Sequence, residues 1–414
     1  MLADIAGYLQ LESWPPVPGG AFWAALALIA GALIGELSRR AFGLPRIVGY
    51  SAVGLVLGLA GLGGVTPSTR MVVDLALALL LFELGSRVRL SWLRANPALL
   101  LTSVAEAAVG FVAIYAVLRW IDLPVGVALA CATLGTCASG AVIARVAGEV
   151  KAAGQVTERM IVLTALNTLV AVLAHKLLVG WLHLEVAGDW VRAISQPLWV
   201  FGGSVLVAAL LASLVAWIAR RLDLADENAA LLLLGLVVLA LTTAQFLNLS
   251  TLLVPLLAGV LLRNRSERPW VWPRHFGTAG GVLVLMMFVI VGGAVTPDAL
   301  LQGGLIALAM LAARALAKGA AVMLLAPWSG LRLRQGLGLA LTLTPMSGTV
   351  LVLLLDLQDA HALFASMVTP VVLSAIAFTE LLGPILVQWG LRIAGEQHPV
   401  AARRAQAPVR EVAA

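Results

Sequence analysis

The amino-acid sequence predicts an all-helical protein that crosses a membrane many times. Of its 414 residues, 61% are hydrophobic and 12% are charged, against roughly 25% charged residues in soluble domains. Its mean hydropathy is +1.01. This composition excludes a water-soluble globule, which needs a polar surface, and a disordered chain, which is less hydrophobic. The 40 glycines suit membrane helices, because small residues let neighbouring backbones approach closely.

Windows of about 20 residues divide the chain into thirteen apolar segments that could span a bilayer. The predicted spans cover residues 20–38, 45–64, 70–86, 97–118, 124–147, 157–182, 195–219, 228–246, 250–263, 276–296, 301–326, 335–356 and 362–391. They form one transmembrane domain over residues 20–391, with an external segment (1–19) before it and a cytoplasmic tail (392–414) after it. The external segment lacks a basic start, which argues against a cleaved signal peptide.

The distribution of basic residues predicts the orientation of these spans. Twenty-one of the 27 Lys and Arg residues fall on one side of the predicted membrane, and only Arg70, Arg119 and Arg192 fall on the other. Because basic loops stay in the cytoplasm, we expect the N-terminus outside and the C-terminus inside a bacterial-type cytoplasmic (inner) membrane. The net charge of +6 is then a result of topology, and we expect no nucleic-acid partner.

The thirteen spans divide into six, a linker and six, so the two halves would have opposite topology. Chemically distinctive residues in matching spans lie at nearly the same separation. Ser139 lies as far before Ser347 as Glu106 lies before Arg314. The pairs Glu106 with Lys318 and Thr168 with Glu380 share a second separation, which is longer by about one helical turn. This near-constancy predicts an inverted repeat with a linker helix.

Polar and small residues interrupt the fifth and twelfth spans near their middles. The candidate ligands there are Thr136 and Ser139 in the first interruption, and Ser347 and Thr349 in the second. Pro345 also breaks the second helix, because proline lacks an N–H and clashes with the preceding turn. Non-helical backbone at membrane depth survives only where it is buried or lines a polar cavity. The matched pair therefore predicts two crossing broken helices around a substrate site, the alternative being packing by small residues.

Charged residues within spans are costly, and they are usually paired or functional. Arg314 and Lys318 lie four residues apart on one face of the eleventh span, and we expect Glu106 and Glu380 to be their partners. A purely structural ion-pair network is the alternative to a role in transport. His175, seven residues after Thr168, is a candidate proton relay.

The two cysteines predict neither a disulfide nor a metal site. Cys131 and Cys137 lie within one apolar segment, without the spacing of metal ligands. No glycine-rich nucleotide motif follows a strand anywhere in the chain, so we expect no cofactor.

Several short segments, in their order and spacing, resemble motifs of one known superfamily. They are PRIVGY with GLVLG (45–50 and 54–58), LFELG with RVRL (81–85 and 87–90), LLAGVLL (256–262) and MFVIVGG (287–293). The chain is similar to the monovalent cation/proton antiporter superfamily, the sodium/proton exchanger-like transporters, over nearly all thirteen spans.

This resemblance implies an architecture and a mechanism. It implies a core (about residues 97–182 and 301–391) with two crossing unwound helices, beside a dimerisation or scaffold domain (about 20–64 and 195–263). It further implies a homodimer that exchanges Na⁺ or K⁺ for protons by an elevator-type movement, and a transporter rather than an enzyme.

The ion-binding motif of the family is present only in part. Asn167 matches the first position of the family's Asn-Asp or Asp-Asp pair, whereas Thr168 stands where the ion-carrying aspartate is expected. Asn167 and Thr168 can still coordinate a cation through neutral oxygens, but a threonine hydroxyl does not titrate near neutral pH. Proton carriage would then belong to Glu380, Glu106 or Lys318.

Two other functions fit the same sequence. The two cations Arg314 and Lys318 could hold a small anion or an organic acid, helped by the N-termini of half-helices. The chain could also be a non-transporting sensor or complex subunit that has lost its ion-carrying group.

The basic residue of the family's eleventh span matches either Arg314 or Lys318.

Overall fold

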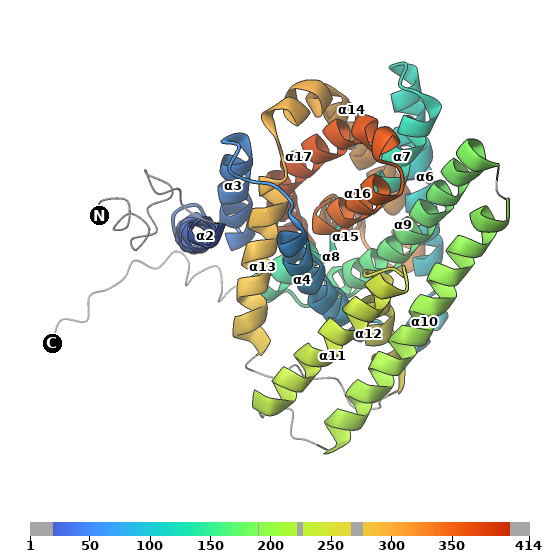
Figure 1. Cartoon of the computed structure of the whole chain (residues 1–414). Helices are drawn as coiled ribbons and strands as arrows, with labels where there is room; N and C mark the ends of the chain where they lie inside the picture. Colours follow the sequence, from blue (N-terminus) through green and yellow to red (C-terminus); the bar gives the residue numbers. More distant parts are fainter. Residues whose placement is uncertain (1–19, 189, 222–226, 266–275, 398–414) are drawn as a thin grey trace, which may run out of the picture.

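The computed structural model describes residues 20–188, 190–221, 227–265 and 276–397, which are nearly all helical and contain no strand (Figure 1). The helices are α2 (Gly20–Phe42), α3 (Arg46–Leu59), α4 (Pro67–Ser86), α5 (Leu90–Ala95), α6 (Pro97–Trp120), α7 (Val125–Gly135), α8 (Gly140–Glu149), α9 (Gln155–Ala187), α10 (Trp190–Arg221), α11 (Glu227–Phe246), α12 (Leu253–Arg265), α13 (Phe276–Gly293), α14 (Pro297–Leu325), α15 (Leu333–Thr342), α16 (Gly348–Ala360) and α17 (Ala362–Ala394), with a 3₁₀ turn, η1 (Pro327–Ser329). The predicted external segment (1–19) and the tail from residue 398 onward lie outside the described residues.

Each of the thirteen predicted spans overlaps one helix or one broken pair of helices. The fifth span is the pair α7 and α8, and the twelfth is the pair α15 and α16, so both predicted interruptions are confirmed. By length and composition, seven helical segments of the described chain are long and apolar enough to cross a membrane, and three shorter helices are apolar. The number of thirteen crossings stays a prediction.

The helix order repeats along the chain. Helices α7 and α15 begin at Val125 and Leu333, the same distance apart in sequence as Ser139 and Ser347. Helices α9 and α17 begin at Gln155 and Ala362, at almost the same separation. The packing repeats as well, because α4 packs on α12 as α13 packs on α3, and α6 packs on α7 as α14 packs on α15. The two halves are therefore built alike, as the sequence predicted.

One residue pairing within this repeat is wrong. Helices α9 and α17 are both 33 residues long, so aligning them from their first residues pairs Thr168 with Ala375. Glu380 lies more than a full turn further along α17. It therefore does not occupy the position that corresponds to Thr168.

Helix boundaries follow ordinary capping chemistry. Thr66 precedes α4 and accepts a hydrogen bond from the backbone N–H of Thr69, and Pro67 occupies the first helical position. Thr296 caps α14 in the same way, with Pro297 as the first helical residue. At the C-terminus of α9, Gly188 has a φ of 68°, the left-handed conformation that glycine adopts without a steric cost.

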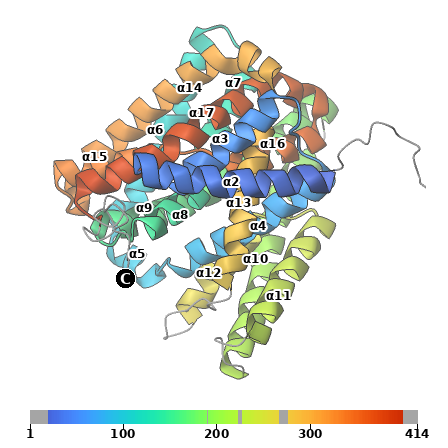
Figure 2. The same cartoon turned by 90° about the vertical axis from the view of Figure 1, so that its left-hand side faces the viewer.

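Some helices of the two groups that the resemblance separates lie apart in the figures, whereas α2 and α3 lie beside α13. Helices α6, α7, α14 and α17 lie together at the top of Figure 1 and of Figure 2, whereas α10, α11 and α12 lie together at the bottom of both. We call the helices within residues 97–182 and 301–391 the core helices. Those within 20–64 and 195–263 are the scaffold helices, and the division into two moving bodies stays a prediction.

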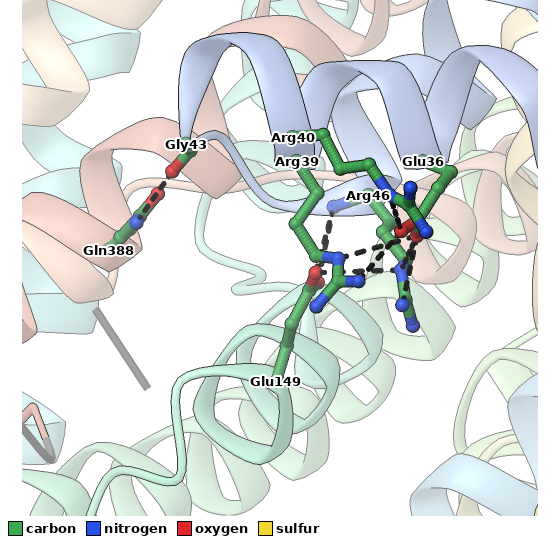
Figure 3. A network of polar contacts seen from close by, with 7 residues as sticks. All are labelled: Glu36, Arg39, Arg40, Gly43, Arg46, Glu149 and Gln388. Atoms are coloured by element: carbon green, nitrogen blue, oxygen red, sulfur yellow. Dashed lines mark hydrogen bonds and ion pairs between the residues drawn. The ribbon is translucent and has the colours of Figure 1, made fainter. Parts of the chain in front are cut away.

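A polar network joins both groups at the start of α3 (Figure 3). The Glu36 carboxylate, on α2, accepts hydrogen bonds from the side chains of Arg39, Arg40 and Arg46. The backbone N–H of Arg46 donates to the carboxylate of Glu149, at the end of core helix α8, over 3.1 Å. The Gln388 amide of α17 donates to the Gly43 carbonyl over 3.0 Å. Core and scaffold helices are therefore bridged by hydrogen bonds at this end of the bundle.

Glycines let two scaffold helices, α12 and α3, pack backbone against backbone on α4 and α13. A Cβ atom added at Gly259 of α12 would lie 2.2 Å from the Phe82 carbonyl oxygen of α4. One added at Gly54 of α3 would lie 2.3 Å from the Val289 carbonyl oxygen of α13. Neither contact leaves room for a methyl group without moving a helix.

We expect Gly259→Ala to destabilise the protein by about 1–3 kcal/mol, because the added methyl group overpacks a contact between two backbones. The melting temperature of the purified protein in detergent measures this effect. Gly235→Ala on α11 is the matched control, since a Cβ there meets nothing within 4 Å. An equal melting temperature for both variants would contradict the prediction.

Candidate functional site

The two broken helices meet at their breaks. Helix α7 ends at Gly135 and α8 begins at Gly140, while α15 ends at Thr342 and α16 begins at Gly348. The backbone N–H of Ser139, in the first break, donates to the carbonyl of Pro345, in the second, over 2.9 Å. The unpaired backbone groups that each break creates are therefore partly satisfied by the other.

Arg314 of α14 binds both breaks through their carbonyl oxygens, and its side chain is almost fully buried. Its Nε donates to the Gly135 oxygen and its Nη2 to the Cys137 oxygen, each over 2.7 Å. Its Nη2 also reaches the Leu343 oxygen, at 3.2 Å, and its Nη1 donates to the Thr344 oxygen. The guanidinium thus supplies donors to the carbonyls that the C-termini of α7 and α15 leave without helical partners.

Lys318 lies one turn after Arg314 and completes this arrangement. Its Nζ donates to the Thr136 carbonyl over 2.8 Å and forms an ion pair with Glu106 Oε2 of α6 over 2.9 Å. Gly110 makes room for the lysine, because a Cβ at that position would lie 2.9 Å from Lys318 Cγ. Both members of this ion pair are buried.

The placement of the two cations follows the electrostatics of the half-helices. The C-terminus of a helix carries partial negative charge, so cations are stabilised where α7 and α15 end. The expectation that Glu106 is a partner of these cations is confirmed for Lys318. The expectation that Glu380 is another is wrong, because backbone carbonyls surround Arg314 instead.

We expect Lys318→Met to destabilise the protein by about 3–5 kcal/mol, because it leaves the Glu106 carboxylate buried without its counter-charge. Adding Glu106→Gln should restore much of that loss, since the double variant no longer buries an unpaired charge. Melting temperatures of both single variants and the double variant in detergent measure the coupling. Additive effects of the two substitutions would contradict it.

Glu380 of α17 forms a separate polar cluster at the second break. Its Oε1 accepts a hydrogen bond of 2.5 Å from Ser347, the residue before α16, and its Oε2 accepts one from Ser51 of α3. All three side chains are buried, and Glu380 has no ion-pair partner among the described residues. The neighbouring Thr379 hydroxyl donates to the Met346 carbonyl within the second break. The carboxylate therefore lies beside the N-terminus of α16, where partial positive charge stabilises an anion.

The remaining hydroxyl groups of the breaks have simple roles or none. The Thr136 hydroxyl donates to the Thr133 carbonyl of its own helix, and Ser139 Oγ accepts from the backbone N–H of Val142 as the cap of α8. Thr349 Oγ1 is buried and has no hydrogen-bond partner among the described residues. Of these predicted ligands, only Thr349 has a side-chain oxygen without a hydrogen-bond partner within the described chain.

Asn167 and Thr168 lie on α9, and no hydrogen bond connects them to Glu380 or to Lys318 within the described chain. The Thr168 hydroxyl donates to the Thr164 carbonyl, one turn earlier in the helix. Asn167 Oδ1 accepts from Ser103 of α6 over 3.4 Å, and its Nδ2 is buried without a partner among the residues described. Both side chains are fully buried, and they form a polar position on α9 that is separate from the clusters around Glu380 and Lys318.

His175 is buried on α9, and neither ring nitrogen has a hydrogen-bond partner among the described residues. The adjacent Lys176 forms an ion pair with Asp356 of α16 over 3.4 Å, and Asp356 also pairs with Arg70 of α4 over 3.1 Å. A second set of charged contacts therefore joins α4, α9 and α16, and the His175 ring is not hydrogen-bonded to it.

The sequence analysis missed two hydroxyl groups of these clusters. Ser51 stands alone among apolar residues of α3, and no pattern in the sequence connects it with Glu380. Ser103 lies three residues before Glu106 on α6, so the spacing would have placed it on the same helix face. Helix periodicity could have found Ser103, but only the tertiary structure finds Ser51.

Inverted repeats, two broken helices that meet at their breaks, and buried charges at those breaks define the molecule as a multi-pass membrane protein of the secondary-transporter class. The sequence model of the transmembrane sodium/hydrogen exchanger family matches residues 24–392. The chain belongs to the sodium/hydrogen exchanger family.

Solved structures support the same fold. A structure of the sodium proton antiporter MjNhaP1 from Methanocaldococcus jannaschii at pH 8 superposes with a TM-score of 0.61 at 17% sequence identity, covering 93% of this chain and 96% of that one. An electron-microscopy structure of the same antiporter gives a TM-score of 0.66 at 17% identity, covering 94% and 98%. The antiporter fold predicted from the sequence is confirmed.

Proposed function

We propose that this protein exchanges a monovalent cation, Na⁺ or K⁺, for protons across a bacterial-type cytoplasmic membrane, and that Glu380 carries both. The single observation behind this proposal is the buried Glu380 carboxylate, which lies at the second break and has hydroxyl groups but, within the described chain, no counter-charge beside it. The family membership and the antiporter fold support the class of reaction.

The chemistry of the Glu380 cluster suits such an exchange. The Glu380 carboxylate and the Ser347 hydroxyl beside it supply oxygen ligands, the kind that Na⁺ and K⁺ prefer. A proton and a monovalent cation each neutralise one negative charge, so one carboxylate holds either of them but not both. This mutual exclusion is what antiport requires, and it needs no aspartate at Thr168.

The other candidate carboxylate is less suitable as a carrier. Glu106 already has the Lys318 ammonium as its counter-charge at 2.9 Å, so a bound cation would have to displace the lysine. Lys318 in turn donates to the Thr136 carbonyl at the end of α7. We assign this pair the structural task of neutralising charge at the breaks.

An anion as substrate is disfavoured by the same contacts. The Arg314 guanidinium already donates to four carbonyl oxygens, and both Arg314 and Lys318 are almost fully buried. An anion would have to break these bonds before it met either cation. Thr349, whose buried Oγ1 has no partner in the described chain, remains a candidate for a further ligand of the cation. Asn167 could contribute only its Oδ1, which accepts a hydrogen bond from Ser103.

The finer parts of the proposal follow the resemblance. The core helices would move as one body against the scaffold helices, in an elevator-type alternating access, and two copies would associate through the scaffold helices. The N-terminus would lie outside and the C-terminus in the cytoplasm, as the basic residues indicate.

Purified protein in proteoliposomes tests this function directly. We expect an imposed Na⁺, K⁺ or Li⁺ gradient to drive proton movement in the opposite direction, read by an internal pH dye and by currents on a solid-supported membrane. Proton movement that follows an anion gradient and ignores all three cations would favour an anion transporter. No movement with any gradient, from folded protein, would favour the non-transporting alternative.

A further inference from the structure

Ser51 and Ser347 donate to the same carboxylate from two different parts of the molecule. Ser347 directly precedes core helix α16 and contacts Glu380 of core helix α17, so this bond lies within the core helices. Ser51 belongs to scaffold helix α3, so its bond to Glu380 crosses from the scaffold to the core. One carboxylate is thus held by an internal bond and a bridging bond.

Each end of the bridging bond lies on a helix that is closely packed on its neighbours. On the scaffold side, α3 packs so closely on α13 that a Cβ at Gly54 would lie 2.3 Å from the Val289 carbonyl oxygen. On the core side, a Cβ at Gly383, one turn after Glu380, would lie 2.9 Å from Pro345 of the second break. The two helix backbones are therefore held by different neighbours, and movement of the core away from α3 stretches or breaks the bond.

The strength of this bond depends on whether Glu380 is loaded. A hydroxyl group that donates to an ionised carboxylate makes a stronger hydrogen bond than one that donates to a neutral acceptor. A proton or a monovalent cation on Glu380 neutralises the carboxylate charge. The contact to α3 is therefore strongest when the site is empty.

We propose that Ser51 is a positioning residue that holds the empty core against the scaffold and so couples the two fluxes. This inference rests on the proposed function of Glu380 as the shared carrier. In an exchanger, the core must not change sides while Glu380 carries neither a proton nor a cation. Such an empty return would let one substrate cross without the other, which is a one-way leak. Ser51 restrains the empty core, and loading with either substrate weakens the restraint.

The first test measures proton leak without any transportable cation. Proteoliposomes in choline buffer, with nitrate as a permeant counter-ion, receive a pH gradient that an internal dye follows. We expect Ser51→Ala to raise the initial rate of this leak, per reconstituted protein, by about fivefold over the parent, the factor that corresponds to the difference between a charged and a neutral hydrogen bond. Ser51→Thr keeps the hydroxyl and should restore the low leak.

Two control variants separate this role from a general loss of packing. Ser347→Ala removes a bond to the same carboxylate but leaves the bridge to α3, so its leak should not rise. Ser374→Ala removes another buried hydroxyl of α17, which donates to the Ala299 carbonyl within the core, and should change neither leak nor exchange. An unchanged leak in Ser51→Ala, or an equal rise in Ser347→Ala, overturns the proposal.

A second measurement does not depend on transport. Cysteines replacing Arg46 and Glu149, whose side chains approach to 4.0 Å, report the position of α8 against α3 through a short bifunctional thiol reagent. The parent protein is the control, because its two cysteines are buried. We expect Ser51→Ala to lower the cross-linking yield and Ser347→Ala to preserve it. Equal cross-linking yields with and without the Ser51→Ala substitution would overturn the restraint, whatever the transport assay shows. No exchange by the parent protein would overturn the proposed function instead.

Discussion

Replacing Glu380 with glutamine is expected to reduce cation-driven proton movement at least a hundredfold while the protein still folds. Glutamine keeps the shape of the side chain and its contacts with Ser51 and Ser347, but it neither binds a proton near neutral pH nor balances the charge of a cation. Glu380→Asp keeps the charge on a shorter side chain, and we expect partial activity. Dye-based proton flux in proteoliposomes measures all three proteins.

Two further variants make this expectation decisive. Glu83→Gln is the matched control, because this carboxylate is partly exposed and pairs with Arg87 one turn later in the chain. It should leave exchange unchanged. Glu106→Gln tests the competing carrier: loss of exchange there, together with full activity of Glu380→Gln, would assign proton carriage to Glu106 instead.

The second large effect is expected from Arg314→Met, which removes the donor of four hydrogen bonds to backbone carbonyls of the two breaks. Each buried carbonyl left without a partner costs about 1–3 kcal/mol. The sum is comparable to the whole stability of a typical domain, about 5–15 kcal/mol. We therefore expect little folded protein, or a melting temperature lowered by about 10 °C or more.

The measurement is the yield and melting temperature of the variant in detergent. Arg334→Met is the control, because this arginine is exposed on α15 and its loss should change neither quantity. Arg314→Lys should fall between the two, since an ammonium keeps the charge but reaches fewer of the carbonyls. A stable, well-expressed Arg314→Met protein would show that the breaks hold together without the guanidinium.

The helices could be predicted from the sequence because their signals are local. A long apolar run, a proline or glycine at its end, and a break marked by Pro345 and Ser347 are all visible within a few residues. The repeat was equally visible, since Ser139 and Ser347 lie the same distance apart as the half-helices that they precede. The finer register that paired Thr168 with Glu380 was wrong.

The candidate site could be predicted only in part. Glu106 and Lys318 were named as partners because buried opposite charges must pair, and they do. The same reasoning failed for Glu380, because carbonyl oxygens at helix ends are acceptors that a sequence does not display. The Arg314 guanidinium instead donates hydrogen bonds to the backbone carbonyl oxygens of Gly135, Thr344 and their neighbours.

The sequence by itself determined the class of this protein, because so many long apolar segments are stable only as helices that cross a lipid bilayer. It also determined which charges had to be explained. Only the tertiary structure shows which partners these charged residues have. The cations bind carbonyl oxygens at helix C-termini, and Glu380 accepts hydrogen bonds from Ser51 of α3 and from Ser347, the residue before α16. Such contacts join residues far apart in the chain, Ser51 and Glu380 among them, and no local pattern encodes them.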